Sequence, residues 1–371
     1  MSVIHHLWAM APCFALFIGC QGSNEGTQTT QDDGGENANN GAGDSGTGND
    51  SGSSDDSGTS GDSGQSDDCD GEPFAVNLPA DDSMHEEDVE WWYWTGHLQD
   101  EEGSWYGFEH VFFRFLMGDS SFLMAHHAIT DVENNTFDYV ASYGSDTTQM
   151  VIDGFAFAQS GQTAEGGDGA DIIHGELDTS TLDLILNDTK KPVLQHCTGY
   201  TDYEFGGYTY YYSRTRMDAA GTLQINGETK NVTGTGWFDH QWGALTQVTN
   251  VGWDWFAIQL DDNREIMLFV VRPDDKSALV GGTMVAADGT STEIDGSDYA
   301  ITAHNEWTSP ESGCVYPIDW TVQVGDMTLE IQSVMEAQEV PNAANTYWEG
   351  AATVSGDATG RAYIELTGYC D

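Results

Sequence analysis

The sequence has little positive charge: its 371 residues include 10 Lys and Arg against 62 Asp and Glu, a formal net charge of −52. Binding of nucleic acid depends on cationic side chains that neutralise phosphates, so this balance excludes nucleic acid as a partner. All the Lys and Arg lie beyond residue 70, as do most of the acidic residues. The part of the chain that can fold is therefore itself strongly acidic.

Long apolar runs are also missing. Residues 7–19 (LWAMAPCFALFIG) are fewer than the ~20 apolar residues that a transmembrane helix needs, and they suit the apolar region of a signal peptide. Phe17-Ile18-Gly19-Cys20 resembles a lipoprotein cleavage box. We therefore expect a signal peptide over residues 1–19, lipid on Cys20, and an extracytoplasmic protein anchored to a bacterial membrane. Secretion without lipid and a misassigned start are the alternatives.

Cysteine is scarce, and no CxxC spacing indicates a zinc site. Four cysteines remain once the signal and Cys20 are set aside, and outside the cytoplasm they can form disulfides in three pairings. Because two of them bracket the folding region, an end-to-end disulfide between Cys69 and Cys370 is one option. The four are Cys69, Cys197, Cys314 and Cys370.

Helical periodicity is absent from the whole chain. Residues 20–71 are Gly, Ser, Asp, Asn and Thr with almost no apolar residue, which predicts a flexible acidic tether. Beyond residue 72, short aromatic or β-branched runs alternate with turn residues, which predicts an all-β protein with closed or nearly closed sheets. The clearest predicted strands are Glu90–Leu98, Tyr106–Leu116, Phe122–Thr130, Tyr208–Met217, Trp253–Asp261, Glu265–Arg272, Ile318–Val324, Thr328–Val334 and Arg361–Thr367.

Several catalytic motifs are missing as well: there is no P-loop, no HExxH and no GxSxG. We therefore expect no cofactor and no metal. Aromatic residues are abundant instead, with 12 Trp, 15 Tyr and 15 Phe. In Glu90-Trp91-Trp92-Tyr93-Trp94 the rings fall on both faces of one strand, which indicates burial on both. Together the rings favour an apolar ligand pocket over an ordinary core.

Two carboxylates stand in aromatic surroundings. Asp239 and His240 follow a strand-like stretch, residues 232–238. Asp254 shares a strand face with apolar residues, so it is paired with a cation, held by backbone N–H groups, or desolvated with a raised pKa. The last option would make it a general acid. A separate pair, His126 and His127, is adjacent on a strand, so we expect one inside and one outside.

Short motifs spread over about residues 85–370 resemble the carotenoid 1,2-hydratase (AttH-like) family. They are Glu90-Trp91-Trp92-Tyr93, Gly96-His97-Leu98, Phe112-Phe113-Arg114, Ala125-His126, Gly236-Trp237-Phe238-Asp239-His240-Gln241-Trp242-Gly243, Trp253-Asp254-Trp255-Phe256, Gln259-Leu260-Asp261-Asp262, Tyr347-Trp348-Glu349-Gly350 and Gly360-Arg361-Ala362-Tyr363-Ile364-Glu365-Leu366-Thr367-Gly368-Tyr369. Together these motifs are specific, although each alone is weak.

The resemblance implies two lipocalin-like antiparallel β-barrel units in tandem, over residues 72–246 and 247–371, and an apolar, isoprenoid-like ligand. Hydratases of this family add water to a terminal C=C bond of an acyclic carotenoid without a cofactor. His240 and Trp242 carry over as catalytic residues by their motif, with Asp239 or Asp254 as the acid. The ligand-binding candidates are Trp91, Tyr93, Phe112, Arg114, His126, Tyr210, Trp253 and Trp255.

Three functions remain open at this point. The first is a hydratase acting on an apolar substrate, and the second is a non-catalytic carrier of lipid or another hydrophobic ligand. A pericyclase or isomerase that only shapes its substrate is a variant of the first. The third is an acidic structural protein of the cell surface. A retained acid inside an aromatic cavity favours the enzyme, a dry cavity with no ionisable group favours the carrier, and the absence of an internal cavity favours the structural protein.

Overall fold

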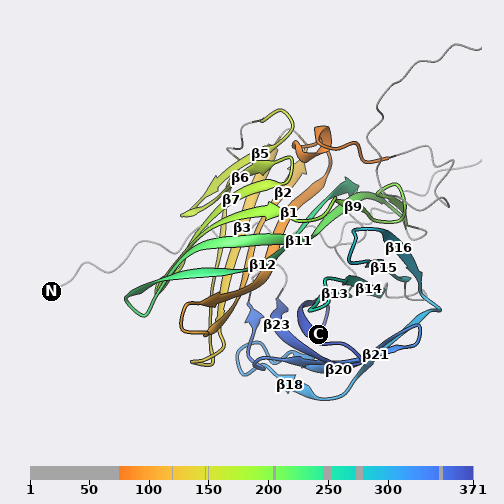
Figure 1. The fold of residues 1–371 in the computed structure, drawn as a ribbon. Helices are drawn as coiled ribbons and strands as arrows, with labels where there is room; N and C mark the ends of the chain where they lie inside the picture. Colours follow the sequence, from red (N-terminus) through yellow and green to blue (C-terminus); the bar gives the residue numbers. More distant parts are fainter. Residues whose placement is uncertain are drawn as a thin grey trace, which may run out of the picture. The chain divides into compact units, whose positions relative to one another are not determined.

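The computed structural model describes residues 75–118, 120–146, 148, 150–203, 206–244, 252–272, 279–341 and 346–370. Within these ranges the chain forms β-strands and one short 3-10 helix, η2 (Ala80–Asp82). The strands build two large antiparallel sheets, each strongly curved (Figure 1). No helix among the described residues is long and apolar enough to cross a membrane.

The first sheet has the strand order β4-β3-β2-β1-β12-β11-β8-β7-β6-β5, with β9 and β10 paired to β11. Its end strands β4 and β5 contact each other, so the sheet is a nearly closed barrel that leaves little exposed edge. Its strands are β1 (Val89–Asp100), β2 (Trp105–Met117), β3 (Ser120–Asp131), β4 (Thr136–Ser145), β5 (Phe155–Gln159), β6 (Gln162–Gly167), β7 (Ala170–Glu176), β8 (Ser180–Asp188), β9 (Val193–Leu194), β10 (Tyr200–Asp202), β11 (Tyr208–Ile225) and β12 (Glu228–Ala244).

The second sheet has the order β16-β15-β14-β13-β24-β23-β21-β20-β17, with β22 paired to β23 and a separate β18-β19 ribbon beside it. Its strands are β13 (Gly252–Leu260), β14 (Glu265–Arg272), β15 (Leu279–Val285), β16 (Ser291–Asp295), β17 (Tyr299–Ala303), β18 (Glu306–Thr308), β19 (Val315–Pro317), β20 (Asp319–Val324), β21 (Met327–Ser333), β22 (Glu339–Val340), β23 (Tyr347–Gly356) and β24 (Gly360–Leu366).

Burial alternates along most strands, because successive side chains point to opposite faces of the sheet. In β8 the alternate residues Leu182, Leu184 and Leu186 are buried, and the residues between them face solvent. β1 differs because nearly all its residues are buried. One face of β1 lines the first barrel, and its other face contacts the second barrel, as the rings on both faces of its sequence predict.

The two barrels meet along a seam built from β1, β2 and β12 on one side and β13, β14, β23 and β24 on the other. A compact apolar cluster fills its centre, composed of Tyr93, Val111, Trp237, Trp255, Ala257 and Met267. Polar contacts also cross it: the Thr235 hydroxyl donates to Oε1 of Gln259 at 2.8 Å, and Nε2 of His97 lies 3.0 Å from the Ala362 carbonyl oxygen. The seam therefore combines apolar packing with directional hydrogen bonds.

The predicted all-β fold with two tandem barrels is confirmed, and the predicted strand Glu265–Arg272 coincides with β14. The prediction that Asp239 and His240 follow a strand is wrong, because β12 continues through them to Ala244. It continues because β1 and β11 pair with β12 along this stretch. Residues 1–74, which include the predicted signal peptide, Cys20 and the whole predicted tether, lie outside the described residues, as does the predicted boundary at 246/247.

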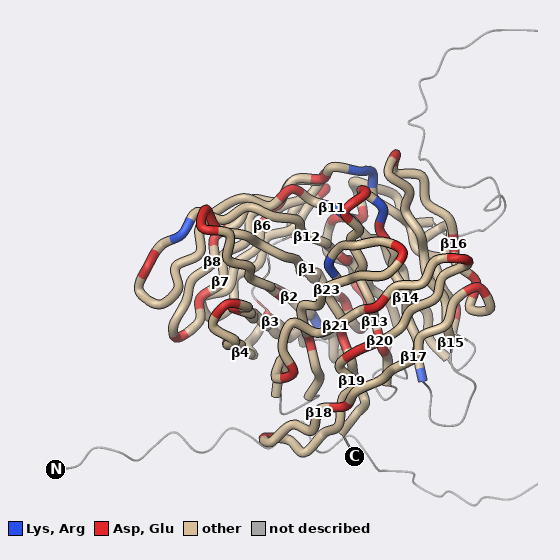
Figure 2. The backbone as a smooth tube through the Cα atoms, turned by 60° about the horizontal axis from the view of Figure 1, so that its bottom comes forward, with Lys and Arg blue, Asp and Glu red and all other residues tan. Residues whose placement is uncertain are grey.

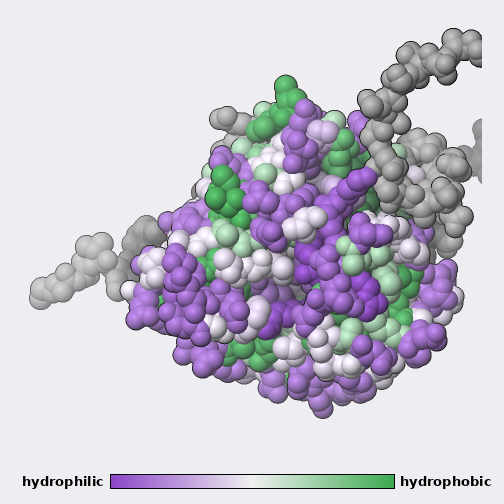
Figure 3. Space-filling model, in the orientation of Figure 1, coloured by the Kyte–Doolittle hydropathy of each residue, from purple (hydrophilic) through white to green (hydrophobic). Residues whose placement is uncertain are grey.

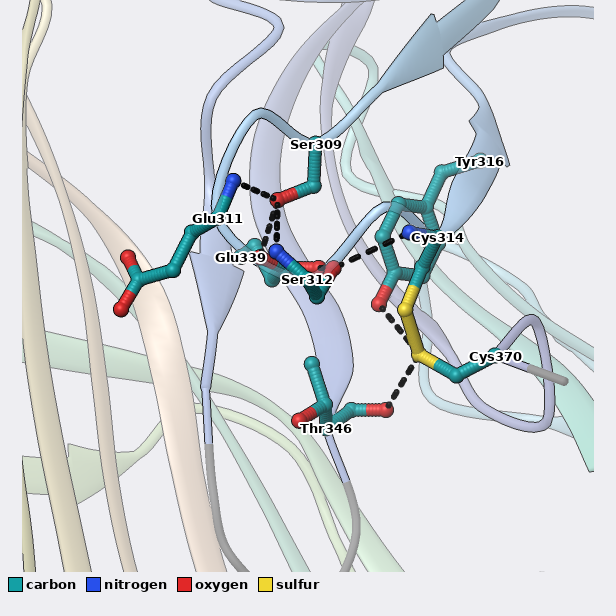
Figure 4. The surroundings of a disulfide bond; sticks show 8 residues. All are labelled: Ser309, Glu311, Ser312, Cys314, Tyr316, Glu339, Thr346 and Cys370. Carbon is teal, nitrogen blue, oxygen red and sulfur yellow. Dashed lines mark hydrogen bonds between the residues drawn. A yellow bond between two sulfur atoms is a disulfide. The ribbon is translucent and has the colours of Figure 1, made fainter.

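A disulfide joins Cys314 to Cys370, with 4.7 Å between the two Cα atoms (Figure 4). An end-to-end disulfide between Cys69 and Cys370 is therefore wrong, since Cys370 already has a partner. The reason is spatial: the ends of β19 and β24 converge within the second barrel, and a disulfide requires Cα atoms roughly 4.4–6.8 Å apart. Cys197 is also disulfide-bonded.

The acidic residues are distributed over the strand ends and loops of both sheets, and few basic residues lie among them (Figure 2). Hydrophilic residues cover much of the face shown in Figure 3. The strong negative charge is thus a property of the folded surface, as the position of the charges in the sequence predicts.

Candidate active site inside the first barrel

Cross-strand rows of side chains line the interior of the first barrel. One row, set by the register of β2, β1, β12 and β11, contains Phe112, Trp92, His240 and Tyr212. All four are completely buried. The Trp92 ring stacks on the His240 ring with centroids 4.6 Å apart, and the Tyr212 ring meets it edge-on. An imidazole is therefore enclosed by aromatic rings inside an otherwise apolar barrel.

The next row toward one end of the barrel holds Arg114, Glu90, Trp242 and Tyr210. Oε1 of Glu90 lies 2.9 Å from Nε2 of His240, and neither side chain has exposed surface. Tyr210 stacks on Trp242 at 5.5 Å. The two rows thus join a buried carboxylate to a buried imidazole.

The segment before β1 covers this end of the barrel and supplies His85. Nδ1 of His85 lies 2.8 Å from Oε1 of Glu90, and the backbone N–H of His85 donates to Oε2 at 2.9 Å. The His85 ring stacks flat on Trp242, with centroids 3.9 Å apart and planes 2° from parallel. Glu90 therefore accepts hydrogen bonds from two histidines on different elements.

Polar anchors hold this covering segment in place. Arg114 donates from a guanidinium N–H to the His85 carbonyl oxygen at 2.8 Å and pairs with Asp146, also at 2.8 Å. Asp82 in η2 accepts a short hydrogen bond from the Tyr212 hydroxyl and another from the backbone N–H of Asp168. The segment is thus tied to the barrel wall on several sides.

Charge states follow from these contacts. Burial raises the pKa of Glu90, but hydrogen bonds from His240 and His85 more than offset burial and leave that pKa below its usual value. Burial opposes protonation of His85, yet Asp81 and Glu90 raise its pKa to about 9. Burial lowers the pKa of His240, although Glu90 opposes the shift. Near neutral pH the site therefore holds ionised Glu90, protonated His85 and neutral His240.

Two buried polar atoms in this site have no hydrogen-bond partner among the described residues, namely Nδ1 of His240 and Nε1 of Trp92. Because Nε2 of His240 donates to ionised Glu90, the neutral ring carries its lone pair on Nδ1. A buried group without a partner costs about 1–3 kcal/mol. The free Nδ1 is a feature of this interior that ordinary packing does not explain.

The same donor atoms could hold a metal ion. Among the described residues, one group of three or more His, Cys, Asp or Glu side chains has its potential ligand atoms within 4.8 Å of one another. It consists of His85, Glu90 and His240. Two imidazoles and a carboxylate form a donor set that suits zinc or a similar divalent ion. The hydrogen bonds among the three residues account for the same arrangement without metal.

Asp239, one candidate acid, does not lie beside the site. It is on the opposite face of β12 from His240 and faces the seam, where it accepts hydrogen bonds from Nε1 of Trp237 at 2.7 Å and from the Tyr211 hydroxyl at 2.8 Å. Burial raises its pKa to about 7. Both its oxygens already have donors within the protein.

Asp254, the other candidate acid, lies in the second barrel. It pairs with Arg272 at 2.8 Å and accepts a hydrogen bond from the Tyr369 hydroxyl at 2.9 Å. Burial raises its pKa, and Arg272 opposes the shift. Of the three explanations that its apolar strand face allows, two are observed together: pairing with a cation and a pKa raised by burial. The β13–β14 hairpin supplies this cation, since Gly252 pairs with Arg272 in the register.

The predicted ligand-binding residues separate into two groups. Phe112, Arg114 and Tyr210 line the first barrel with His240 and Trp242. The other group lies in the seam and comprises Trp91, Tyr93, His126, Trp253 and Trp255. Side-chain alternation separates the groups, because neighbouring strand residues point to opposite faces.

The prediction that one of the adjacent histidines lies outside is wrong. His126 and His127 are both 1% exposed. His126 points into the seam, where its Nδ1 is 2.7 Å from the Tyr347 hydroxyl, while Nδ1 of His127 lies 3.2 Å from Nδ1 of His110 in the first barrel. The second barrel covers the face that would otherwise be outside.

A hollow of about 420 Å³ lies over β5, β6 and β7 and includes no predicted site residue. Two residues of the observed cluster, Glu90 and His85, are not among the site residues predicted from the sequence. Glu90 opens the first family motif, so the signal was present but not assigned a role. His85 carries no motif, and only its position in the fold brings it to Glu90.

Comparison with known proteins agrees with this architecture. A search of curated proteins finds no match. Among solved structures, an AttH-type protein of Nitrosomonas europaea superposes with a TM-score of 0.74 at 27% identity, covering 81% of this chain and 98% of that one. Kievitone hydratase from Nectria haematococca superposes with a TM-score of 0.67 at 16% identity, covering 80% and 94%, which shows a shared fold.

A family model agrees over nearly all of the described chain. The AttH-like model matches residues 71–369, a range that contains both barrels and every residue of the His85, Glu90 and His240 cluster. The match, the tandem barrels and the motifs along their strands lead to one conclusion: this chain belongs to the AttH-like family.

Proposed function

We propose that this protein is an acid–base catalyst that adds water to a C=C bond of an apolar, isoprenoid-like small molecule bound inside the first barrel. One observation carries the proposal. His240 is buried among aromatic rings, its Nε2 is bound to Glu90, and its Nδ1 has no partner among the described residues. A carrier of apolar ligands has no need of such a pair, whereas a proton-transfer catalyst requires one.

The protonation states set the order of steps. Neutral His240 takes a proton from water through Nδ1 while the water oxygen bonds to one alkene carbon. The second alkene carbon, which holds the electron pair of the broken π bond, then takes that proton from Nδ1. Water is consumed and His240 returns to its starting state. This order requires a C=C bond that is polarised, for example by conjugation to a carbonyl group.

Glu90 supports both steps from the other side of the ring. When Nδ1 gains its proton the imidazole becomes a cation, and the Glu90 carboxylate at 2.9 Å from Nε2 stabilises this charge. The carboxylate also fixes the tautomer that leaves Nδ1 unprotonated. Trp92, Trp242 and Tyr212 surround the ring and hold its orientation in apolar surroundings.

The direct test is to incubate the full chain with a panel of apolar enones and acyclic isoprenoids in H₂¹⁸O and to analyse the products by mass spectrometry. We expect a product heavier than its substrate by one H₂¹⁸O, and its loss in His240→Gln. His174→Asn is the matched control, since half-buried His174 also contacts a carboxylate, Asp183, at 2.7 Å. Ligand that binds unchanged would establish a carrier, and absence of binding would refute the proposal.

The proposal also includes the cellular location. An exported protein with lipid on Cys20 would hold the barrels beside a membrane in which apolar substrates dissolve. The apolar run before Cys20 and the polar tract after it support this arrangement. With metabolic labelling by a radioactive fatty acid, we expect label in the wild type and none in Cys20→Ala, which should leave the membrane fraction. Equal labelling of both proteins would contradict lipidation at Cys20.

A further inference from the structure

We propose that His85 is a positioning residue for His240: it holds Glu90 in the orientation in which this carboxylate accepts the Nε2 proton of His240. This inference rests on the proposed function for its catalytic meaning, although the geometry that it describes does not. His85 lies outside the barrel strands, in the segment that covers the barrel end.

His85 contacts both oxygens of Glu90. Its ring Nδ1 is 2.8 Å from Oε1, and its backbone N–H donates to Oε2 at 2.9 Å. His240 contacts Oε1 alone, at 2.9 Å. Two contacts on different oxygens fix the plane of a carboxylate, whereas one contact leaves it free to rotate. The orientation of Glu90 therefore depends on His85.

His85 is itself held by three contacts, two to its ring and one to its backbone. Trp242 stacks on one face at 3.9 Å, Arg114 binds the His85 carbonyl oxygen at 2.8 Å, and Oδ1 of Asp81 lies 3.6 Å from Nε2. Both ring nitrogens thus face carboxylates, an environment that favours the doubly protonated ring. A rigid cation beside Glu90 is what a completely buried carboxylate requires.

Other charged groups near Glu90 already have partners. Arg114 stands opposite Glu90 in the register but pairs with Asp146. Arg214 on β11 pairs with Asp171 and lies 3.6 Å from Asp82, which also accepts hydrogen bonds from the Tyr212 hydroxyl and a backbone N–H. His240 is kept neutral by burial. Among these groups, His85 is the one cation in direct contact with Glu90.

Two substitutions separate the roles of His85. His85→Asn places an amide N–H close to the position of Nδ1, so it keeps a neutral donor and removes the charge. His85→Ala removes the donor and the charge of the side chain and keeps the backbone N–H that donates to Oε2 of Glu90. His174→Asn is again the control, because it removes a histidine–carboxylate contact from the surface of the same barrel.

The experiment is ¹⁵N NMR of the full chain labelled at its 11 His, titrated with acid, with His240 assigned from its loss in His240→Gln. In wild type we expect His240 as the Nε2–H tautomer well into the acid range, because Glu90 stays ionised. In His85→Ala we expect the titration of Glu90, seen through His240, to move up by at least about one pH unit, a tenfold change in proton affinity. His85→Asn should fall between, and His174→Asn should match wild type.

The acid limb of the pH–rate profile should shift to higher pH in the same order. The shift should be largest in His85→Ala, smaller in His85→Asn and absent in His174→Asn. Unchanged His240 spectra in folded His85→Ala and His85→Asn would overturn the inference. A stoichiometric metal ion in the purified protein, lost on substitution of His85, would also overturn it, because the three residues would then be metal ligands. If the spectra shift as expected but no hydration occurs, the positioning role stands and the proposed function fails.

Discussion

At the scale of single residues, the side chains of β12 point alternately into the first barrel and into the seam. This alternation decides which of them can contact the other residues of the candidate site. Asp239 and His240 are neighbours in the sequence but face the seam and the barrel interior respectively. The carboxylate that reaches His240 is Glu90, from the adjacent strand. Proximity along a strand is therefore a poor guide to which side chains contact each other, and cross-strand register is a better one.

Glu90→Gln should lower the hydration rate by about 10²- to 10⁴-fold, the range that general acid–base catalysis contributes. The amide cannot stabilise the His240 cation and does not fix its tautomer. The double variant with His240→Gln should be little slower than the slower single variant, since the two residues act as one unit. Asp183→Asn, the carboxylate partner of half-buried His174, is the control and should retain the full rate.

Asp254→Asn should leave the hydration rate within about twofold of wild type, because Asp254 pairs with Arg272 in the second barrel. It should lower the free energy of unfolding by about 1 kcal/mol, as expected for a partly exposed ion pair. Urea unfolding and the hydration assay on the same sample measure both effects. A large loss of rate at unchanged stability would restore Asp254 as the acid.

At the scale of elements, β1 is the strand that contributes to both the first barrel and the seam. It pairs with β2 and β12 in the first barrel, and its other face contacts the second barrel. Gly96 lies in β1 between Phe108 of β2 and Gly236 of β12. A Cβ at this position would lie 2.2 Å from the Thr235 carbonyl oxygen and 2.9 Å from Cε1 of Phe108.

Gly96→Ala should therefore lower the free energy of unfolding by about 1–3 kcal/mol or more, as overpacking does. The backbone oxygen cannot move without breaking the β1–β12 pairing. Chemical denaturation followed by Trp fluorescence measures the change. Thr302→Ala, on the exposed edge strand β17, is the control and should change stability by less than about 0.5 kcal/mol.

The covering segment before β1 is the second decisive element. It is short and has little regular structure, yet it supplies His85 and the anchoring residue Asp82. Strand patterns predict barrels well because period two is a strong signal. They say nothing about a segment whose place depends on individual hydrogen bonds to the barrel wall.

At the scale of the whole molecule, the seam buries carboxyl groups from both barrels. Oε1 of Glu109 lies 3.1 Å from the Tyr347 hydroxyl, and Oε2 has no partner among the described residues. Glu349 accepts a short hydrogen bond from Tyr93. Burial raises the pKa of Glu109 to about 8 and that of Glu349 well above its usual value. Packing of the two barrels against each other is therefore linked to protonation of Glu109 and Glu349.

The pKa of Glu109 is higher in the folded chain, about 8, than its ordinary value of 4.5. The folded state holds this proton more tightly, so its stabilising effect is complete below about pH 4.5 and is lost as pH rises to about 8. Relative to Glu109→Gln, wild type should lose on the order of 1–4 kcal/mol of unfolding free energy across this window. Urea unfolding of both proteins at several pH values tests this, and parallel pH profiles would contradict it.

The sequence alone determined the class of fold, the acidic surface and the family. Period-two alternation and turn residues specify strands locally, charge is additive, and the family motifs lie on continuous stretches such as Gly236–Gly243. It also indicated His240 and Trp242, because both lie within one such stretch.

Only the tertiary structure decided which side chains contact His240, Asp254 and Cys370. Glu90 and His85 reach His240 through strand register and through a segment folded over the barrel end, Arg272 reaches Asp254 across a hairpin, and Cys370 reaches Cys314 within the second barrel. Each of these contacts joins residues that are distant in the sequence or lie on different elements. Their geometry depends on how two closed sheets curve and pack, which no local pattern of residues encodes.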